Sequence, residues 1–423
     1  EFQVVVLAGA HGQMLYPLAE GTPKGLLPVA NKPVIAYVME MLEKMGQVFT
    51  KGVFLATDEQ SAALLEEYIE RYRSFTSNRF KVIGIPHENF GSIGAMRFIA
   101  PMIDSDCIIV SGDVLMDFEV LNLLINKYRF SQAACTMLVQ KTSGSEDVQL
   151  FGVSGDRIVL MLGAVDVEEG MQLKRSLLTS APCFTLRNDL VDAYVYIFKH
   201  WVIDEVFTAD EITRGGKTSI KNDLMPILLE LSHRPNVVPL SSTALENEIY
   251  VNYVAVPPEM FCRRISNIKA YLETNLAACI PLTGVSKKGE AFKPVPAALQ
   301  STMNNLPNFI IPFYSNRTLL VDAPSAAKQV SSDSIVGEGL DIRPKAMITK
   351  SVMGSRISIG ENSKVFNSVL MDDVVIEANC IVTNSVISAG VVVGAGSKIT
   401  NSQIANGSKI PAKSVIKDEV KLA

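Results

Sequence analysis

The sequence predicts an α/β domain followed by a parallel β-helix. Short apolar runs alternate with amphipathic helical stretches through residues 1–240. Residues 331–423 carry aliphatic side chains at a short, fixed spacing, and the segment 241–330 between them is mixed in composition and contains several prolines. We therefore expect three parts with these boundaries: an α/β domain, a connector with one helix and a loop, and a solenoid.

The first part opens with a strand, a glycine-bearing loop and a helix. Residues 4–7 form an apolar run typical of a buried parallel strand, and residues 34–45 have the spacing of an amphipathic helix. Further strands are expected at 52–57, 80–85 and 107–110, with a helix at 61–72. This alternation predicts a Rossmann-like, mixed but mostly parallel sheet that binds ligands beyond the carboxyl ends of its strands.

The later elements have weaker patterns. A helix at 118–128 follows Asp117, which we expect to cap it. Residues 151–153 and 157–160 suggest a small antiparallel element. In the connector, one helix is expected from about Cys262 to Cys279.

The third part repeats every 17 residues. Aliphatic or methionine positions recur in steps of 6, 6 and 5, at Val336, Ile342, Ile348, Met353, Ile359, Val365, Leu370, Ile376, Val382, Ile387, Val393, Ile399, Ile404 and Ile410. An α-helix would show steps of 3 and 4, whereas three short sides per cycle are typical of a triangular β-helix. Acyltransferases with such coils usually work through a histidine on the coils. Because no histidine follows His233, we expect a docking surface instead.

Composition excludes several classes of function. The net charge of −5 gives no indication of nucleic-acid binding through bulk charge. The six cysteines are scattered without a C-x-x-C motif, so we expect a reducing compartment and no structural zinc. Since no apolar run is long enough for a signal peptide or a membrane span, we expect a cytosolic protein with no membrane partner.

The loop after the first strand carries the most informative motif. Residues 7–18 read Leu-Ala-Gly-Ala-His-Gly-Gln-Met-Leu-Tyr-Pro-Leu, and residues 23–29 read Pro-Lys-Gly-Leu-Leu-Pro-Val. Together with Asn-Lys-Pro at 31–33, they resemble the N-terminal signature of sugar-nucleotide pyrophosphorylases, a nucleotidyltransferase family. That signature runs roughly L-A-G-G-x-G-T-R-L-x-P-L, then P-K-x-L-L-P-V-x-N-K-P. The resemblance implies a nucleotidyltransferase-like fold over residues 1–240.

The first half of this signature is altered at three positions. Ala10 replaces a glycine, Gln13 a threonine and Met14 an arginine. The family's arginine stabilises charge on the phosphates during transfer, and a methionine has neither charge nor hydrogen-bond donor to replace it. The resemblance therefore predicts a degenerate site that does not catalyse nucleotidyl transfer.

Two further segments resemble the family at strand ends. Residues 91–97 are similar to its G-T-A-x-x-L-R segment around the nucleotide base, with Ile93 in place of a small residue. Ser111-Gly112-Asp113 is similar to its G-D signature, whose aspartate holds Mg²⁺. The alternatives are that Asp113 caps a turn and that Lys24 is a solvated loop lysine.

The resemblance also places other polar residues near the family's sugar and metal positions. Residues 190–206 resemble the family's strand and following helix, and Asp192, Tyr194 and Tyr196 fall near the family's sugar site. Asp223 is either a second metal ligand or a carboxylate at a helix N-terminus.

From these residues we expect no catalytic residue, no metal and no cofactor. The vestigial phosphate and metal positions are Gly9, Gly12, Lys24, Gly91 and Asp113.

The order of a pyrophosphorylase-like domain and a left-handed β-helix narrows the resemblance further. It is shared by GDP-mannose and ADP-glucose pyrophosphorylases and by two subunits of eukaryotic translation initiation factor 2B, the guanine nucleotide exchange factor for initiation factor 2. The degraded signature, the connector at 262–275 and the coils around 334–337 and 367–371 resemble the gamma subunits. The sequence ends soon after the coils, so we do not expect the helical exchange domain of the epsilon subunit.

That resemblance implies a non-catalytic scaffold in a hetero-oligomer. A gamma subunit pairs with epsilon, joins the alpha, beta and delta subunits, and helps to place initiation factor 2 for release of GDP. The sheet edge and the apolar faces of the β-helix are the expected contact surfaces. Two other hypotheses remain: an enzyme that makes a nucleotide sugar with Lys24 and Asp113, and a regulatory homologue that binds a nucleotide sugar without turnover.

Overall fold

The computed structural model describes most of the chain, and its parts group into two compact units. The described residues are 1–9, 13–19, 22–45, 52–72, 80–87, 91–141, 149–163, 173–209, 212, 216–234, 240–241, 249–283, 329–331 and 333–421. The first unit comprises Glu1–Ala10, Pro23–Gly25 and Ile35–Arg264, and the second comprises His11–Thr22, Leu26–Val34 and Ile265–Ala423. Most of the predicted connector loop lies outside the described residues.

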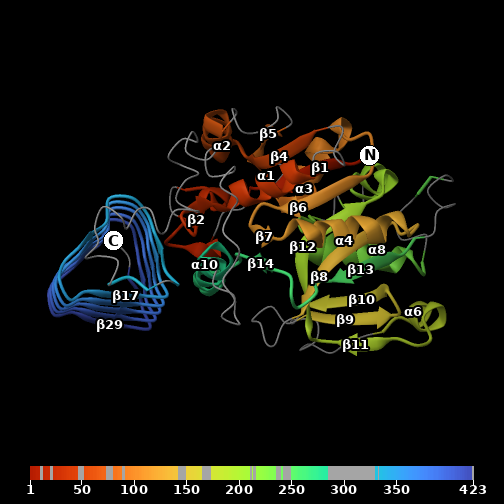
Figure 1. Ribbon diagram of the computed structural model, residues 1–423. Coiled ribbons are helices and arrows are strands. Elements are labelled where there is room, and N and C mark those ends of the chain that lie inside the picture. The colour runs from red at the N-terminus through yellow and green to blue at the C-terminus, as the bar shows by residue number, and fades with distance from the viewer. Residues whose placement is uncertain are drawn as a thin grey trace, which may run out of the picture. The chain divides into compact units, whose positions relative to one another are not determined.

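A ten-stranded mixed sheet forms the centre of the first unit (Figure 1). Its strands are β1 (Gln3–Leu7), β4 (Val53–Asp58), β5 (Phe80–Ile85), β6 (Cys107–Ser111), β8 (Cys135–Lys141), β9 (Gln149–Ser154), β10 (Arg157–Gly163), β11 (Thr185–Arg187), β12 (Leu190–Phe198) and β13 (Val251–Ala255). They lie in the order β11-β9-β10-β13-β8-β12-β6-β1-β4-β5. All run in one direction except β10, β11 and β12, so the sheet is mostly parallel, as the sequence predicts.

Helices follow several of the strands. The helices that the hydrophobic spacing predicts at 34–45, 61–72 and 118–128 occur as α1 (Val34–Lys44), α2 (Glu59–Tyr72) and α4 (Phe118–Arg129), and the structure also contains α3 (Gly91–Ile99), α6 (Arg175–Ser180) and α8 (Met225–Leu231). Side chains from α3 and α8 share one buried cluster with alternate residues of the central strands, among them Cys107 and Ile109 of β6. This alternation is the period of two expected of a strand with covered faces.

The predicted helix from Cys262 to Cys279 begins later than expected. Residues Cys262–Arg264 form an extended strand, β14, which pairs antiparallel with β7 (Val114–Met116). The helix itself, α10, spans Ile268–Thr283. The local spacing could not reveal this boundary, because the partner strand lies far away in the sequence.

Three parallel sheets build the β-helix of the second unit, which Figure 1 shows with a triangular cross-section. The first contains β15 (Ile335–Val336), β18 (Val352–Met353), β21 (Val369–Leu370), β24 (Val386–Ile387), β27 (Gln403–Ile404) and β30 (Val420–Lys421). The second contains β16 (Asp341–Ile342), β19 (Ser358–Ile359), β22 (Val375–Ile376), β25 (Val392–Val393) and β28 (Lys409–Ile410). The third contains β17 (Met347–Thr349), β20 (Lys364–Phe366), β23 (Ile381–Thr383), β26 (Lys398–Thr400) and β29 (Val415–Lys417).

The register of these sheets confirms the 17-residue period. Ile348 pairs with Val365, and Val365 with Val382, each 17 residues further along the chain. The predicted aliphatic positions form one buried column of side chains inside the coils, with Ile342 packed against it. The predicted solenoid is therefore confirmed.

Left-handed backbone conformations mark the corners of the coils. Asn367, Asn384 and Asn401 have φ values of 51°, 48° and 49°, and they occupy equivalent positions one coil apart. Asparagine tolerates this conformation better than most residues. The Asn367 side-chain amide also donates a hydrogen bond to the side-chain oxygen of Asn384, which ties neighbouring coils together at the corner.

Part of the signature loop folds with the β-helix. Residues Pro28–Val29 (β2) and Lys32–Pro33 (β3) form a small antiparallel ribbon in the second unit. The Ala30 N–H donates to the Asn275 side-chain oxygen of α10 at 2.9 Å, and the Asn31 amide donates to the Met353 carbonyl oxygen of β18 at 2.6 Å. These residues of the signature therefore have a structural role in this chain.

Candidate functional site

Asp113 lies just beyond the carboxyl end of β6, where a parallel sheet places its ligands. It is buried, with a residue exposure of 5%. Its Oδ2 forms an ion pair with the Nζ of Lys24, and the Nε of Arg264 lies 3.2 Å from the same oxygen. The Ser111 hydroxyl donates to Oδ1. Both carboxylate oxygens therefore already have partners from within the chain.

The charges around Asp113 keep its carboxylate ionised. Burial alone would raise the pKa of Asp113, but the positive charges of Arg264 and Lys24 and the hydrogen bonds from Lys24 and Ser111 outweigh burial and lower it to about 2. In turn, the negative charge of Asp113 raises the pKa of Arg264 against the opposing effect of burial. The cluster is an ion triad of one carboxylate and two cations.

Arg264 is the member of this triad that the sequence did not indicate. It reaches Asp113 because β14 pairs with β7, which places Arg264 opposite Val114. The preceding Arg263 is exposed, as expected for neighbouring residues of a strand that face opposite sides. The sequence does not indicate which of the two consecutive arginines, Arg263 or Arg264, faces inward. The strand pairing identifies Arg264 as the inward-facing one.

Tyr194 connects the triad to a second cluster. The guanidinium carbon of Arg264 lies 3.5 Å from the centre of the Tyr194 ring, and the Nζ of Lys221 lies 5.2 Å from it. Tyr194 has a φ of 57° at an irregularity in the pairing of β12 with β8. A tyrosine in the left-handed region is uncommon, and here it lies beside two cations.

A buried carboxylate supports this irregular turn. The Tyr194 N–H donates to Asp192 Oδ1 at 2.8 Å, and the Tyr196 hydroxyl donates to Asp192 Oδ2. Burial raises the pKa of Asp192, and the hydrogen bonds from both tyrosines and the charges of Lys221 and Arg264 act in the opposite direction. Asp192 thus holds the backbone of the turn, and Tyr196 is a core residue with 2% exposure.

Gly9 of the signature and Gly91 of the segment 91–97 are required by packing within this chain. A Cβ on Gly9 would lie 2.9 Å from the backbone nitrogen of Asp58. Gly91 has a φ of +85°, and a Cβ there would lie 2.5 Å from the carbonyl oxygen of Thr218. Both contacts are closer than a real side chain allows, so these glycines serve close backbone approach whether or not a phosphate binds.

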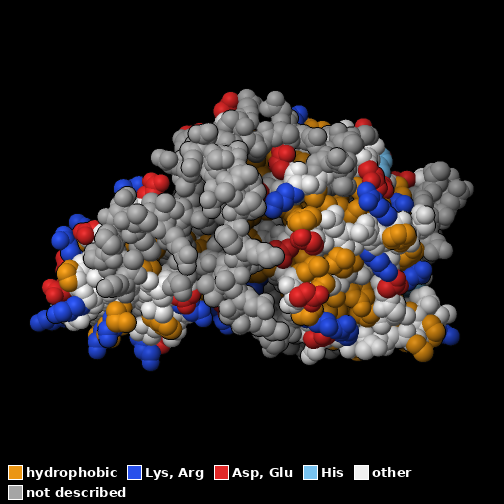
Figure 2. All heavy atoms as spheres, in the orientation of Figure 1, with side chains coloured by type: hydrophobic (Ala, Val, Ile, Leu, Met, Phe, Trp, Pro, Cys, Tyr) orange, Lys and Arg blue, Asp and Glu red, His pale blue; other side chains and the backbone are white. Residues whose placement is uncertain are grey.

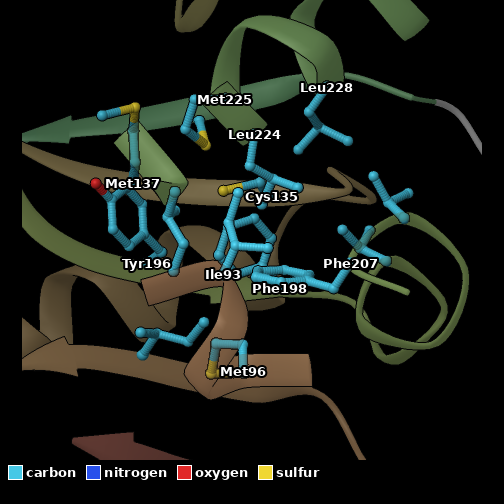
Figure 3. Packing of buried hydrophobic residues seen from close by; sticks show 14 of the residues in the cluster. Ile93, Met96, Cys135, Met137, Tyr196, Phe198, Phe207, Leu224, Met225 and Leu228 are labelled. Atoms are coloured by element: carbon cyan, nitrogen blue, oxygen red, sulfur yellow. The ribbon is translucent and has the colours of Figure 1, made fainter. Parts of the chain in front are cut away.

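Ile93 lies in the hydrophobic core. It is fully buried in the cluster that α3 shares with the central sheet. Figure 3 shows Ile93 and Met96 of α3 in this cluster with Tyr196, Phe198 and Phe207. The larger side chain at this position is therefore accommodated as part of the core packing.

The remaining predicted positions are Ala10, Gly12, Met14 and Asp223. Met14 is 74% exposed, and Gly12 and Ala10 lie outside the described residues. The Asp223 carboxylate accepts hydrogen bonds from the Thr218 N–H at 3.0 Å and from the Ser219 N–H at 2.9 Å. These bonds agree with the alternative in which Asp223 stabilises a helix N-terminus.

Among the described residues, those around Asp113 do not fit a Mg²⁺ site. No group of three or more His, Cys, Asp or Glu side chains within the described ranges could hold a metal ion. The carboxylate that resembles the family's metal ligand is paired with Lys24 and Arg264, and a cation would have to displace both. Asp117, the nearest acidic residue along the chain, accepts the Phe261 N–H at 2.8 Å instead of capping α4.

None of the helices in the described parts of the chain has the length and apolar character needed to cross a bilayer.

Comparisons with known proteins agree with the order of the two folds. Residues 3–156 match the family model described as nucleotidyl transferase, and residues 318–409 match the one described as GlmU-like, C-terminal hexapeptide. The chain thus combines a nucleotidyltransferase domain with a left-handed β-helix of the hexapeptide type.

The chain is similar to two proteins named translation initiation factor eIF2B subunit gamma. The one from Schizosaccharomyces pombe is 28% identical over 305 residues, which cover 65% of each chain. The one from Dictyostelium discoideum is 26% identical over 254 residues, 54% of this chain and 57% of the relative. The predicted resemblance to gamma subunits is confirmed. In both cases the match spans less than two thirds of the relative.

A shorter match connects the chain to another subunit of the same factor. The S. pombe protein named eIF2B subunit epsilon is 33% identical over 150 residues, which are 33% of this chain and 21% of that relative. The relatives of this chain therefore include proteins named as two different subunits of one translation initiation factor.

Proposed function

We propose that this chain is a non-catalytic scaffold subunit of a guanine nucleotide exchange factor for translation initiation factor 2. In this role it pairs with an epsilon-type subunit, joins alpha, beta and delta subunits in the cytosol, and promotes GDP release. The observation that carries the proposal is the internal pairing of Asp113, in a chain whose matched relatives include gamma subunits.

The pairing of Asp113 removes the group that nucleotidyl transfer would need most. Transfer builds negative charge on phosphate oxygens, which a metal ion and free cations stabilise. Here Lys24 and Arg264 neutralise the carboxylate, and the exposed Met14 supplies no charge. We accordingly propose that Gly9, Gly12, Lys24, Gly91 and Asp113 are vestigial phosphate and metal positions, and that the chain needs no metal or cofactor.

A scaffold contributes to exchange by positioning. An exchange factor must bind the nucleotide-free partner more tightly than the GDP form. A rigid body that holds a catalytic subunit and its substrate together raises their effective concentration without new chemistry. Within this proposal, residues 1–240 and 331–423 are the two assembling domains, and 241–330 connects them.

The proposal is tested first on assembly. The chain is purified at low salt from its own cells and examined by native mass spectrometry. We expect a large complex that contains this chain, a heavier subunit and smaller ones. Recovery only as a 46.0 kDa monomer or a homo-oligomer would contradict the proposal.

The second test concerns exchange. GDP release from initiation factor 2 is measured with the epsilon-type subunit alone and with this chain added, and we expect the addition to accelerate release. Calorimetry with GDP-mannose, GTP and UDP-glucose separates the regulatory alternative, because micromolar binding of one of them would favour a nucleotide-binding homologue.

A further inference from the structure

The third sheet of the β-helix presents a face without carboxylates. On each of its strands the central residue points into the coil, so the flanking residues point outward. These ten outward positions are Met347, Thr349, Lys364, Phe366, Ile381, Thr383, Lys398, Thr400, Val415 and Lys417. We call them the third-sheet face. It contains three lysines, four large apolar side chains and three threonines.

The apolar side chains of the third-sheet face are exposed to solvent. Met347 is 56% exposed, Phe366 47%, Ile381 38% and Val415 74%. By contrast, the outward residues Val352 and Val369 of the first sheet are each 2% exposed. Orange and blue side chains lie next to each other along this side of the coil, near β17 and β29 of Figure 1 (Figure 2).

The lysines of this face have few acidic partners among the described residues. Lys364 and Lys398 form no ion pair with any carboxylate in the described ranges. Lys417 has one long ion pair, in which its Nζ lies 4.0 Å from the carboxylate of Asp418 at the adjacent corner. Along one column the side chains alternate as Met347, Lys364, Ile381, Lys398 and Val415. Coils about 4.8 Å apart place both lysines of this column, Lys364 and Lys398, between two apolar side chains.

We propose that the third-sheet face is the docking surface for an acidic, partly apolar protein surface on a neighbouring subunit. This inference rests on the function proposed above. Carboxylates on the partner would pair with the three lysines, and its apolar side chains would cover Met347, Phe366 and Ile381.

The chemistry of the face distinguishes between possible occupants. A second copy of the same face would bring lysines against lysines, so self-pairing is opposed by like charge. The phosphates of a nucleic acid could pair with the lysines, but a nucleic acid has no aliphatic surface that would cover the exposed apolar side chains. The face spans roughly 20 Å by 10 Å, or about 200 Å², far below the ~800 Å² per partner of a stable binary interface. It therefore suits one contact among several in a larger assembly.

Charge reversal on the complete chain tests the proposal. The variant K364E/K398E/K417E changes the face, and the control K81E/K269E/K409E changes three exposed lysines elsewhere by the same net charge. Each is reconstituted with the epsilon, alpha, beta and delta subunits, and the affinity of assembly is measured by sedimentation between 50 and 300 mM salt, roughly the range in which screening changes. We expect the face variant to assemble at least ~10-fold more weakly than wild type, and the control within ~2-fold.

The outcomes distinguish failure of the proposed function from failure of this inference alone. If wild type itself fails to assemble, the proposed function is wrong and the inference falls with it. If wild type assembles and the face variant matches the control, the inference alone is overturned. Wild-type binding to a 20-nucleotide poly-U RNA or to vesicles with phosphatidylserine, lost in the face variant while assembly is unchanged, would also overturn it.

A second measurement avoids dependence on the folding of the variant. Carbodiimide joins a lysine directly to a carboxylate that it contacts, so it is applied to the wild-type assembly. We expect cross-links from Lys364, Lys398 or Lys417 to acidic residues of another subunit. Cross-links from Lys81 or Lys409 alone would contradict the proposal.

Discussion

The guanidinium carbon of Arg264 lies 3.5 Å from the centre of the Tyr194 ring, and its Nε lies 3.2 Å from the Asp113 carboxylate. One side chain thus satisfies a buried charge and covers an aromatic face. A residue in this position stabilises the fold and at the same time fills the space beside the carboxylate.

Replacing Arg264 tests its role in the triad. Arg264→Met keeps much of the side-chain volume but leaves Lys24 as the only cation on Asp113 among the described residues, so we expect a loss of about 2 kcal/mol in the free energy of unfolding. Urea denaturation at pH 7 measures it. The neighbouring exposed residue gives the control, Arg263→Met, for which we expect a change within about 0.5 kcal/mol. Equal effects of the two substitutions would count against the triad.

The lowered pKa of Asp113 predicts a pH dependence of stability. The carboxyl has an ordinary value of 3.8 and a folded-state pKa of about 2, so its contribution is present above pH 3.8 and is lost as pH falls toward 2. The difference corresponds to about 2 kcal/mol. We expect wild type to exceed Asp113→Asn in stability at pH 5 to 7, and this gap to narrow below about pH 4.

Urea denaturation of both proteins at each pH measures this gap. Asp373→Asn serves as the control, because Asp373 pairs with Arg356 on the exposed surface, where solvent screens the interaction. We expect a smaller difference for that pair. A constant gap between wild type and Asp113→Asn from pH 7 down to pH 3 would show that Asp113 is not held ionised by its neighbours.

We expect that restoring the missing arginine alone will not restore catalysis. We expect Met14→Arg to remain inactive with Mg²⁺, GTP and mannose 1-phosphate, because Ala10, Gln13 and Ile93 also depart from the family's signature and Asp113 remains paired. Release of pyrophosphate measures the reaction. Robust turnover in this single variant would mean that the site is nearly intact.

Gly91 provides a test of whether the loop glycines are structural. Gly91→Ala places a Cβ 2.5 Å from the Thr218 carbonyl oxygen at a φ of +85°, so we expect a loss of about 2 kcal/mol or more. Gly155→Ala, with a φ of +63° and nothing within 4 Å, isolates the conformational cost, about 1 kcal/mol. Thermal unfolding compares them. If both substitutions lower the stability by a similar amount, the close contact with Thr218 is not the reason that position 91 requires glycine.

Local periodicity was sufficient for most of the fold. The strand at 80–85 occurs as predicted, and the helix at 118–128 differs by one residue. The 17-residue period predicted the pairing of the coils because every coil has the same neighbours, so sequence distance and spatial order coincide. Where the pairing partner is remote, as for Cys262–Arg264 with β7, the local pattern indicated a helix instead.

The sequence indicated only some of the residues of the candidate site. The family signature identified Lys24 and Asp113, which are 89 positions apart, but it could not show that they pair with each other. Arg264 is not part of any family motif, and its contact with Asp113 follows from the pairing of β14 with β7. Tyr194 fell near the expected sugar position, yet its left-handed backbone and its contact with Arg264 depend on an irregularity between two strands.

The uniform register of the β-helix also limits how its length can change in evolution. A strand of the β-helix does not tolerate a shift by one residue. One extra residue just before Ile381 would bring Ile381 into the interior and turn Val382 outward. This strand would then no longer match the register of the two neighbouring coils. Removing 17 consecutive residues instead would join equivalent corners and keep every remaining pair in register. Natural insertions and deletions in this part of the chain should therefore come as whole coils, or as loops that leave the coil at a corner.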